Sequence, residues 1–177
     1  MLNPKKSTLH FHNNIFYFSK RVSFHTPPSC GVRPARCAPQ YLNMDLFMYV
    51  FSDSSQRKLE TCCPDLIRLF NEVIKHRDCK IIYGRREKEE QDRLFKEGKS
   101  RLNYPHSSHN RYPSRGIDVA PYPIDWKDAG RFYMFVGYVQ AVAEKLNIPI
   151  RCGADWDGDT RTTDQKFNDL VHFEVRE

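Results

Sequence analysis

The sequence predicts a small α+β domain, and three observations support this fold class. The chain has 177 residues, a length that suits one domain. Apolar residues recur at helical spacing in some segments and alternate or form short runs typical of strands in others. These segments do not follow the regular strand–helix–strand order of a parallel sheet, which favours helices packed against a small sheet.

Residues 1–43 differ from the rest of the chain. Of the 28 basic residues, six precede Asp45 and no acidic residue does, which leaves 22 basic against 22 acidic residues from Asp45 onward. No apolar period persists here, and the longest apolar stretch, residues 15–18, is too short for a secretory signal. We therefore expect a disordered basic extension at 1–43 and a folded domain at 44–177. We interpret this segment as an extension upstream of an alternative start at Met44 or Met48, because the sequence becomes regular within a few residues of Met44; the alternative is a transit peptide.

Charge and hydropathy exclude two classes of partner. The body of the chain is neutral and carries no nucleic-acid-binding motif, so we expect no nucleic-acid partner. No apolar run approaches the ~20 residues that would cross a bilayer, so we expect no stable membrane insertion. The expected place of synthesis is the cytoplasm, because neither a signal peptide nor a transmembrane segment is recognised.

The first half of the domain predicts two helices and one strand. Pro64 sits where a helix can begin, and residues 64–76 place apolar side chains at helical spacing, namely Leu66, Ile67, Phe70, Val73 and Ile74. Residues 79–83 (CKIIY) are typical of a short buried strand. Residues 87–96 predict a charged helix with Leu94 and Phe95 turned inward, closed by Gly98.

The second half predicts a loop at residues 99–114, which are rich in Pro, Ser, Asn and His. A strand at 116–120 follows, then the longest helix at 128–146, and finally strands at 148–152 and 170–175. The core face of the long helix is Phe132, Phe135, Val136, Val139, Val142, Ala143 and Leu146.

The cysteines do not predict a metal or redox motif. No C-x-x-C pair is present among Cys30, Cys37, Cys62, Cys63, Cys79 and Cys152. We interpret them as small buried thiols in a reducing compartment.

Strand periodicity places several polar side chains opposite the core. In the last strand, alternation puts Val171, Phe173 and Val175 on one face and His172 and Glu174 on the other. In the strand at 116–120, Ile117 and Val119 point inward, so Asp118 points the other way. A carboxylate in an apolar strand is unfavourable unless an Arg or a metal ion meets it.

Together, two histidines and this carboxylate form a candidate metal site. His109 lies on the loop before the Asp118 strand, and His109, Asp118 and His172 are a three-ligand zinc set that leaves a fourth position for water. A catalytic site also needs a base that is not a ligand, and Asp169, three residues before His172, can supply it. The alternative for His172 is a surface histidine with a solvated neighbour.

Four motifs, in order, resemble the zinc D-alanyl-D-alanine carboxypeptidase and L-alanyl-D-glutamate endopeptidase family, which includes phage endolysins. Residues 84–91 (GRREKEEQ), with Leu94, Phe95 and Gly98, are similar to its G-Y-R-x-x-E-E-Q…L-F…G run. Residues 107–109 (SSH) and 116–118 (GID) resemble its S-x-H-x-x-G-x-A-x-D motif. Residues 153–156 (GADW) resemble its G-G-D-W turn, and 169–174 (DLVHFE) its closing D-x-x-H-x-E.

The resemblance implies a Hedgehog/DD-peptidase-like fold, a small antiparallel sheet flanked by helices, and a role for each matched residue. His109, Asp118 and His172 would bind one zinc ion. Asp169 would be the general base that also returns the proton to the leaving amine. Arg86 would polarise the scissile carbonyl or stabilise the oxyanion, provided that Arg85 fills the aromatic position of the motif, and Ser107 would contact the substrate.

Two departures from the family pattern stand out. The gap between His109 and Asp118 is two residues longer than in the short motif, which suggests a larger loop over the site. Gly116 replaces the usual Ala.

Other acidic and basic residues keep alternative interpretations. Arg86 belongs to a charged run that is also typical of a solvated helix start. Glu174 is interpreted as a structural carboxylate rather than as a ligand. The acidic segment Asp155–Asp159 is typical of a polar turn, with a calcium site as the alternative.

The predicted function is a monomeric zinc peptidase that hydrolyses peptidoglycan stem peptides, of the L-Ala-D-Glu endopeptidase type, in lysis of the bacterial cell wall. The alternatives are a D-Ala-D-Ala carboxypeptidase of the same fold, a non-catalytic metal- or wall-binding protein, and a basic nucleic-acid binder.

Overall fold

A computed structural model describes residues 48–176, so the extension expected at 1–43 lies outside the described residues. The helices are α1 (Asp53–Leu59), α2 (Pro64–Val73), α3 (Lys88–Lys96) and α4 (Ala129–Lys145), with a 3₁₀ turn, η1 (Ser108–Asn110). The strands are β1 (Cys79–Tyr83), β2 (Gly116–Pro121), β3 (Ile150–Gly153) and β4 (Asp169–Val175). The α+β class is therefore confirmed.

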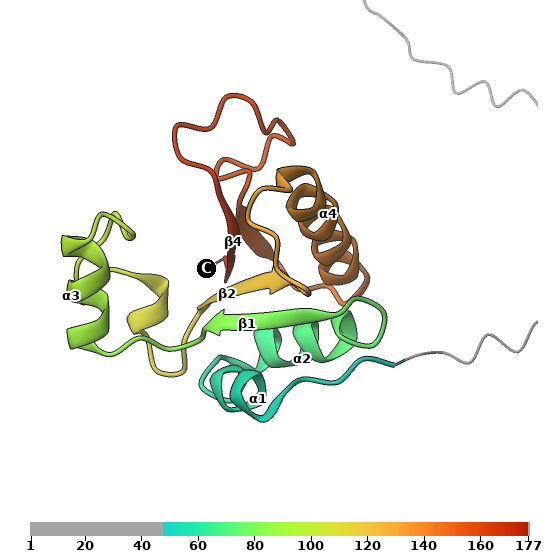
Figure 1. Ribbon diagram of the computed structural model, residues 1–177, viewed down its shortest axis with the longest axis horizontal. Helices are drawn as coiled ribbons and strands as arrows, with labels where there is room; N and C mark the ends of the chain where they lie inside the picture. Colours follow the sequence, from blue (N-terminus) through green and yellow to red (C-terminus); the bar gives the residue numbers. More distant parts are fainter. Residues whose placement is uncertain (1–47, 177) are drawn as a thin grey trace, which may run out of the picture. The chain divides into compact units, whose positions relative to one another are not determined.

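The strands form one antiparallel sheet in the order β1–β2–β4–β3 (Figure 1). The central pair is β2 and β4, which are far apart in the sequence but hydrogen-bonded in space. In their register Asp118 lies directly opposite His172, and Ile117 lies opposite Phe173. The pairing therefore brings two predicted site residues together from different halves of the domain.

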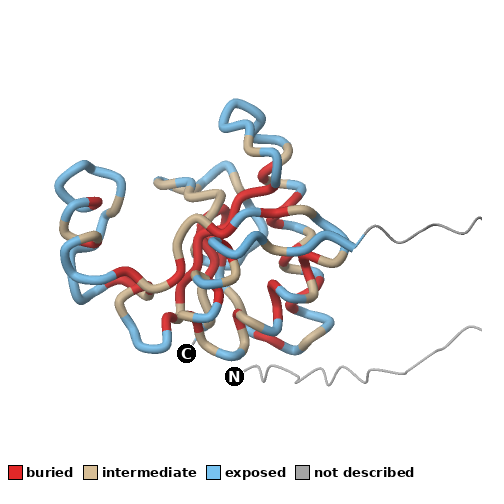
Figure 2. The backbone as a smooth tube through the Cα atoms, turned by 60° about the horizontal axis from the view of Figure 1, so that its bottom comes forward, coloured by how far each residue is buried: buried red, intermediate tan, exposed pale blue. Residues whose placement is uncertain are grey.

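The hydrophobic core lies on one face of this sheet. Helices α2 and α4 pack against it and against each other, and Figure 2 shows the buried segments gathered in the interior of the folded domain. Phe173 on β4 is fully buried and meets Phe70 of α2 and Phe135 of α4 edge-on, with ring centroids 5.6 and 6.2 Å apart. The opposite face of the sheet is thus left for polar side chains.

Most predicted elements are present with small shifts in their ends. The helix expected to reach His76 ends at Val73, and the chain continues in a turn in which the His76 N–H bonds to the Val73 carbonyl three residues back. Gly98 closes α3 with a positive φ of 70°, as expected. The loop expected at 99–114 contains the turn η1.

Helix α1 was not predicted. It has seven residues and buries only Ser55 and Leu59, so it carries no apolar period. A local cap and a tertiary contact hold it instead: the Ser52 hydroxyl caps its first turn, and the Ser55 hydroxyl accepts the Ile81 N–H of β1 at 3.2 Å. No helix in residues 48–176 is both long and apolar enough to span a membrane.

Two predicted core positions are wrong. Phe95 is 45% exposed, because α3 stands to one side of the sheet (Figure 1) and buries only Gln91 and Leu94. Val171 lines a cavity, whereas its neighbour Leu170 packs against the core. The register of β3 on β4 shifts between Cys152 and Gly153, which interrupts the regular alternation near the start of β4.

Candidate active site

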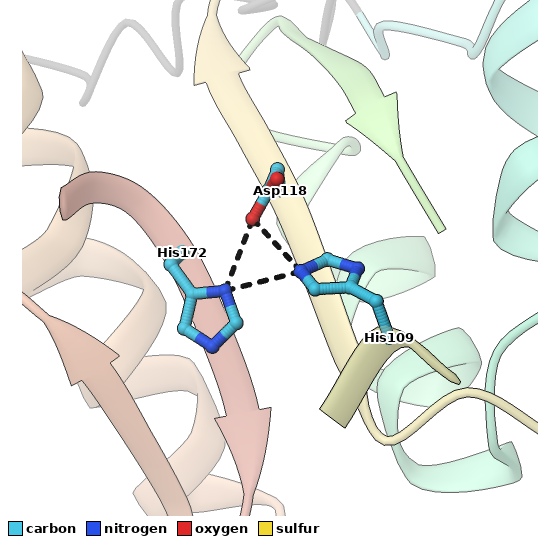
Figure 3. A group of neighbouring side chains, drawn as sticks. All are labelled: His109, Asp118 and His172. Carbon is cyan, nitrogen blue, oxygen red and sulfur yellow. Dashed lines mark hydrogen bonds and ion pairs between the residues drawn. The ribbon is translucent and has the colours of Figure 1, made fainter. Parts of the chain in front are cut away.

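Three buried side chains converge on the polar face of the sheet. Asp118 comes from β2, His172 from β4 and His109 from η1, and Figure 3 shows all three pointing toward one another. Their exposed fractions are 5, 7 and 1%. The structure therefore brings together the three residues that the sequence predicts as ligands.

Hydrogen bonds of the turn η1 explain how a loop residue is held in a buried site. The Ser107 hydroxyl accepts the His109 N–H at 3.3 Å, and the Asn110 carboxamide oxygen accepts the Ser107 N–H at 3.2 Å. The Asn110 amide group donates to the Arg86 carbonyl at 3.0 Å, and the Arg86 N–H donates to the His109 carbonyl at 2.9 Å. These bonds fasten the turn to the chain just after β1, with the His109 ring facing inward.

The spacing of the converging atoms fits a tetrahedral metal ion. His109 Nε2 lies 3.1 Å from Asp118 Oδ1 and 3.2 Å from His172 Nδ1, and the last two atoms are 3.0 Å apart. Ligands of a tetrahedral zinc ion bind at ~2.0–2.1 Å and so lie roughly 3.3 Å from one another. The triangle can therefore hold a metal ion above it.

The outer nitrogens of both imidazoles orient the rings for this task. His109 Nδ1 lies 2.7 Å from the Gly84 carbonyl oxygen, which can only accept, so Nδ1 carries the proton and Nε2 presents a lone pair. His172 Nε2 lies 3.2 Å from Glu174 Oε2, so it donates to that carboxylate. Metal-binding histidines have such partners almost always, because the outer hydrogen bond sets the tautomer.

The charge of the metal-free site is concentrated on Asp118 and His172. Burial disfavours an ionised Asp118, but the hydrogen bond that His172 donates and the charge of Arg86 hold its pKa well below the usual value. Burial also disfavours a charged His172, but hydrogen bonds to Asp118 and Glu174 outweigh it and raise its pKa to about 9. Burial lowers the pKa of His109. A metal ion must therefore displace a proton from His172.

Arg86 supplies the positive charge expected beside Asp118. Its guanidinium forms an ion pair with the other carboxylate oxygen, Oδ2, and lies over the Tyr83 ring at 4.6 Å. The Arg86 side chain is 9% exposed, whereas Arg85 points away and pairs with Glu87 at 2.8 Å. Of the two neighbouring arginines, Arg86 is thus the one at the site, and the solvated-run interpretation is wrong for it.

A cavity of about 750 Å³ opens onto the triangle, and both remaining candidates line it. Asp169 stands at the start of β4, where burial and then the negative charge of Asp118 raise the pKa of its carboxyl. Ser107 is buried beside His109. A carboxylate of raised pKa that does not belong to the triangle is a suitable proton acceptor.

Comparisons with known proteins agree with this arrangement. The model of the family described as phage L-alanyl-D-glutamate peptidase matches residues 47–176. The chain belongs to this family. It is 28% identical over 114 residues to the L-alanyl-D-glutamate peptidase of Escherichia phage T5, a match that covers 62% of this chain and 82% of that protein.

A solved structure confirms the expected fold. The L-Ala D-Glu endopeptidase ChiX of Serratia marcescens superposes with a TM-score of 0.58 at 20% identity, covering 75% of this chain and 94% of ChiX. The DD-peptidase-like fold, a small antiparallel sheet flanked by helices, is therefore shared.

The structure also explains two motif residues for which the sequence suggested no role. Gln91, in the E-E-Q motif, is fully buried and donates to the Leu102 carbonyl at 2.5 Å and to Ser100 Oγ at 2.9 Å. It holds the loop on one side of the cavity. Trp156, in the G-A-D-W turn, stacks on the His172 ring with centroids 5.4 Å apart.

Two partners of the site escaped sequence reasoning. The Gly84 carbonyl, which orients His109, belongs to the backbone and leaves no side-chain signal. Arg151 donates from Nε to Glu174 Oε1 at 2.7 Å; it lies opposite Glu174 across β3 and β4. Only the strand register reveals this pair, and it shows Glu174 as a supporting carboxylate rather than a ligand of the triangle.

The acidic segment 155–159 forms a hydrogen-bonded turn. The Asp155 carboxylate accepts backbone N–H groups of Gly158, Asp159 and Thr160 at 2.8, 3.2 and 3.0 Å. Asp157 and Asp159 are exposed, although ligand atoms of the three carboxylates lie within 4.8 Å of one another. The structure favours the polar-turn interpretation over calcium.

Proposed function

We propose that this chain is a zinc-dependent L-alanyl-D-glutamate endopeptidase that cleaves peptidoglycan stem peptides. Membership of the phage peptidase family supports the reaction, and the triangle of His109, Asp118 and His172 supports a metal ion. The observation that carries the proposal is that two imidazole nitrogens and a carboxylate oxygen meet within 3.2 Å in a buried site. Two imidazoles and a carboxylate, with a fourth position left open, suit a catalytic zinc ion.

The proposed roles divide between metal binding and proton transfer. Bound zinc supplies a Lewis acid for the scissile carbonyl and acidifies water at neutral pH. Asp169 accepts the proton of the attacking water and delivers it to the leaving amine, for which its raised pKa is suited. Because Asp169 lines the cavity but makes no bond to the triangle, the same carboxylate is free to act in both steps.

Arg86 and Ser107 are proposed to bind the reacting amide. The Arg86 guanidinium lines the cavity beside Asp118, so its positive charge stabilises the negative charge that develops on the carbonyl oxygen of the scissile amide. The Ser107 hydroxyl already accepts the His109 N–H, and its own hydrogen can be donated to substrate. Each of the two residues therefore holds a predicted metal ligand in place and also offers a group that can bind the substrate.

Zinc analysis combined with digestion of muropeptides tests the proposal. The purified protein is expected to carry about one zinc ion per chain, removable by a chelator, and to release products cut between L-Ala and D-Glu. His109→Ala and His172→Ala should abolish tight zinc binding and cleavage. His76→Ala is the matched control, since His76 is exposed at the end of α2 and should leave both unchanged. Full metal occupancy in both site variants would refute the ligand assignment.

The same digest separates the remaining alternatives. Loss of only a terminal D-alanine would indicate the carboxypeptidase, and zinc binding without any cleavage would indicate a metal- or wall-binding protein. We further propose that the enzyme is made in the cytoplasm, acts on the bacterial cell wall in lysis and is a monomer.

A further inference from the structure

A second cavity, of about 570 Å³, adjoins the catalytic one. The two cavities share a wall formed by Leu102, Ser108, Arg151, Trp156, Asp157 and Glu174. The second cavity is lined by four arginines, Arg111, Arg115, Arg151 and Arg176, against two carboxylates, Asp157 and Glu174. We call this cavity the arginine groove. Because the two cavities lie side by side at this wall, one extended ligand can contact both.

Several of these guanidinium groups are held in place by the fold. Arg115 Nη2 donates to the carbonyls of Val175 and Arg176 at 3.3 and 2.9 Å. The Arg176 guanidinium lies against the Gly158 backbone, where an added Cβ would come within 2.4 Å of Nη2. Arg151 lies over the Trp156 ring at 5.5 Å and pairs with Glu174. Charges that are held in position lose little entropy when an anion binds.

Both carboxylates of the groove are engaged by protein groups. Glu174 bonds to Arg151 and to His172, and Asp157 accepts a hydrogen bond from Gln165 at 3.1 Å. Because Arg151 neutralises Glu174, the groove keeps three further arginines, Arg111, Arg115 and Arg176, against one further carboxylate, Asp157, and is positive overall. A positive groove beside a catalytic cavity attracts and orients negatively charged substrate.

The proposed reaction requires a negative charge close to the scissile bond. In an L-alanyl-D-glutamate bond, glutamate supplies the amine, and glutamate has two carboxyl groups, of which the continuing chain uses one. The other carboxyl group is free unless it is amidated. L-alanine, on the acyl side, contributes no charged side chain. Negative charge is therefore concentrated on the leaving side of the substrate.

We propose that the arginine groove binds the carboxylates on the leaving side of the stem peptide and selects stems in which these groups are not amidated. This inference rests on the proposed function and adds the substrate class. Guanidinium groups suit it because they bind carboxylates with paired, directional hydrogen bonds. The continuous wall favours the stem peptide over a separate anionic wall polymer, since the groove would then extend the same substrate's binding site.

The test compares a soluble stem peptide with free leaving-side carboxylates and the same peptide with these groups amidated. The wild-type enzyme is expected to cleave the free acid with a lower KM. Arg111→Gln combined with Arg176→Gln should raise KM for the acid by roughly tenfold, the scale of a lost charged hydrogen bond. The kcat and zinc content should stay near wild type, and the preference for acid over amide should shrink.

Two single variants serve as controls. Arg57→Gln removes the same charge from an exposed position on α1 and should leave KM unchanged. Lys166→Gln removes a charge that lines the catalytic cavity but not the groove. An unchanged acid preference in the double variant, or a loss that follows Lys166→Gln instead, would overturn the inference. So would reduced binding to intact walls with unchanged kinetics on soluble peptide, which indicates a wall polymer. If the wild type cleaves neither peptide, the proposed function itself fails.

Discussion

Asp118 and its neighbours show how contacts of single residues offset the cost of burying a charged side chain. One carboxylate oxygen meets two imidazole nitrogens and the other meets Arg86, so a strand residue that would otherwise carry an uncompensated charge has partners on every side. The outer imidazole nitrogens bond to the Gly84 carbonyl and the Glu174 carboxylate. The same contacts that offset burial also orient the rings toward a metal ion.

Asp169→Asn tests the proposed base. The amide is nearly isosteric but cannot accept a proton, so turnover should fall by ~10²-fold or more while zinc content stays at the wild-type level. Zinc analysis and the rate of muropeptide cleavage measure the two effects. Near-native activity in this variant would assign proton transfer to another group.

Glu174→Gln should do the reverse of Asp169→Asn: it should weaken zinc binding and leave the chemical step intact. The substitution removes the negative charge of the group that accepts the His172 Nε2–H, and mutation of such outer partners lowers metal affinity by roughly 10–100-fold. We expect weaker zinc binding in a competition titration with a chelator. Excess zinc should restore cleavage, which it cannot do for Asp169→Asn. Tight zinc binding together with lost turnover would instead make Glu174 a participant in the chemistry.

At the scale of elements, the site depends on how the end of β1 is held against α1. A Cβ on Gly84 would come within 2.2 Å of the Lys58 carbonyl oxygen and 2.4 Å of Thr61 Oγ1, so the close approach requires glycine. The Gly84 carbonyl in turn accepts the Nδ1–H of the His109 imidazole. A short unpredicted helix, which ends at Leu59, therefore contributes to the position of a ligand, His109, that lies 50 residues further along the sequence.

Gly84→Ala should destabilise the fold by about 1–3 kcal/mol, the usual cost of overpacking, and should weaken zinc binding by moving the carbonyl. Gly137→Ala is the matched control, because a Cβ there meets nothing within 4 Å in the exposed part of α4. That control should stabilise by roughly 0.5–1 kcal/mol. Urea unfolding measures both changes, and equal stability of the two variants would contradict the packing argument.

For the whole molecule, we predict that residues 1–43 are dispensable for catalysis. They contain no periodic apolar face, and the match to the peptidase family begins only at residue 47. A chain that starts at Met44 should therefore fold and cleave soluble muropeptides as the full chain does. Circular dichroism melting and a digest check this directly.

The same truncation removes six positive charges and leaves equal numbers of acidic and basic residues. Retention on phosphatidylglycerol vesicles should therefore fall, and the effect should be largest at low salt. Aggregation of the shortened chain, or loss of its activity on soluble substrate, would move the domain boundary toward the N-terminus.

The spacing of residues within single elements was sufficient to predict much of this protein. Strand alternation placed Asp118 and His172 opposite the core, and helical spacing identified the buried faces of α2 and α4, because both periods follow from backbone geometry within one element. The order of four motifs identified the family. None of these inferences required knowledge of which elements are neighbours.

Tertiary structure decided the rest. Whether Arg85 or Arg86 faces the site, how His109 enters it from a loop, and that Arg151 pairs with Glu174 all depend on contacts between distant segments. Phe95 and Val171 were misplaced for the same reason, since a local period cannot show that α3 stands apart or that the β3–β4 register shifts. Side-chain direction is a property of one element, but burial and partners are properties of the neighbours that long-range packing supplies.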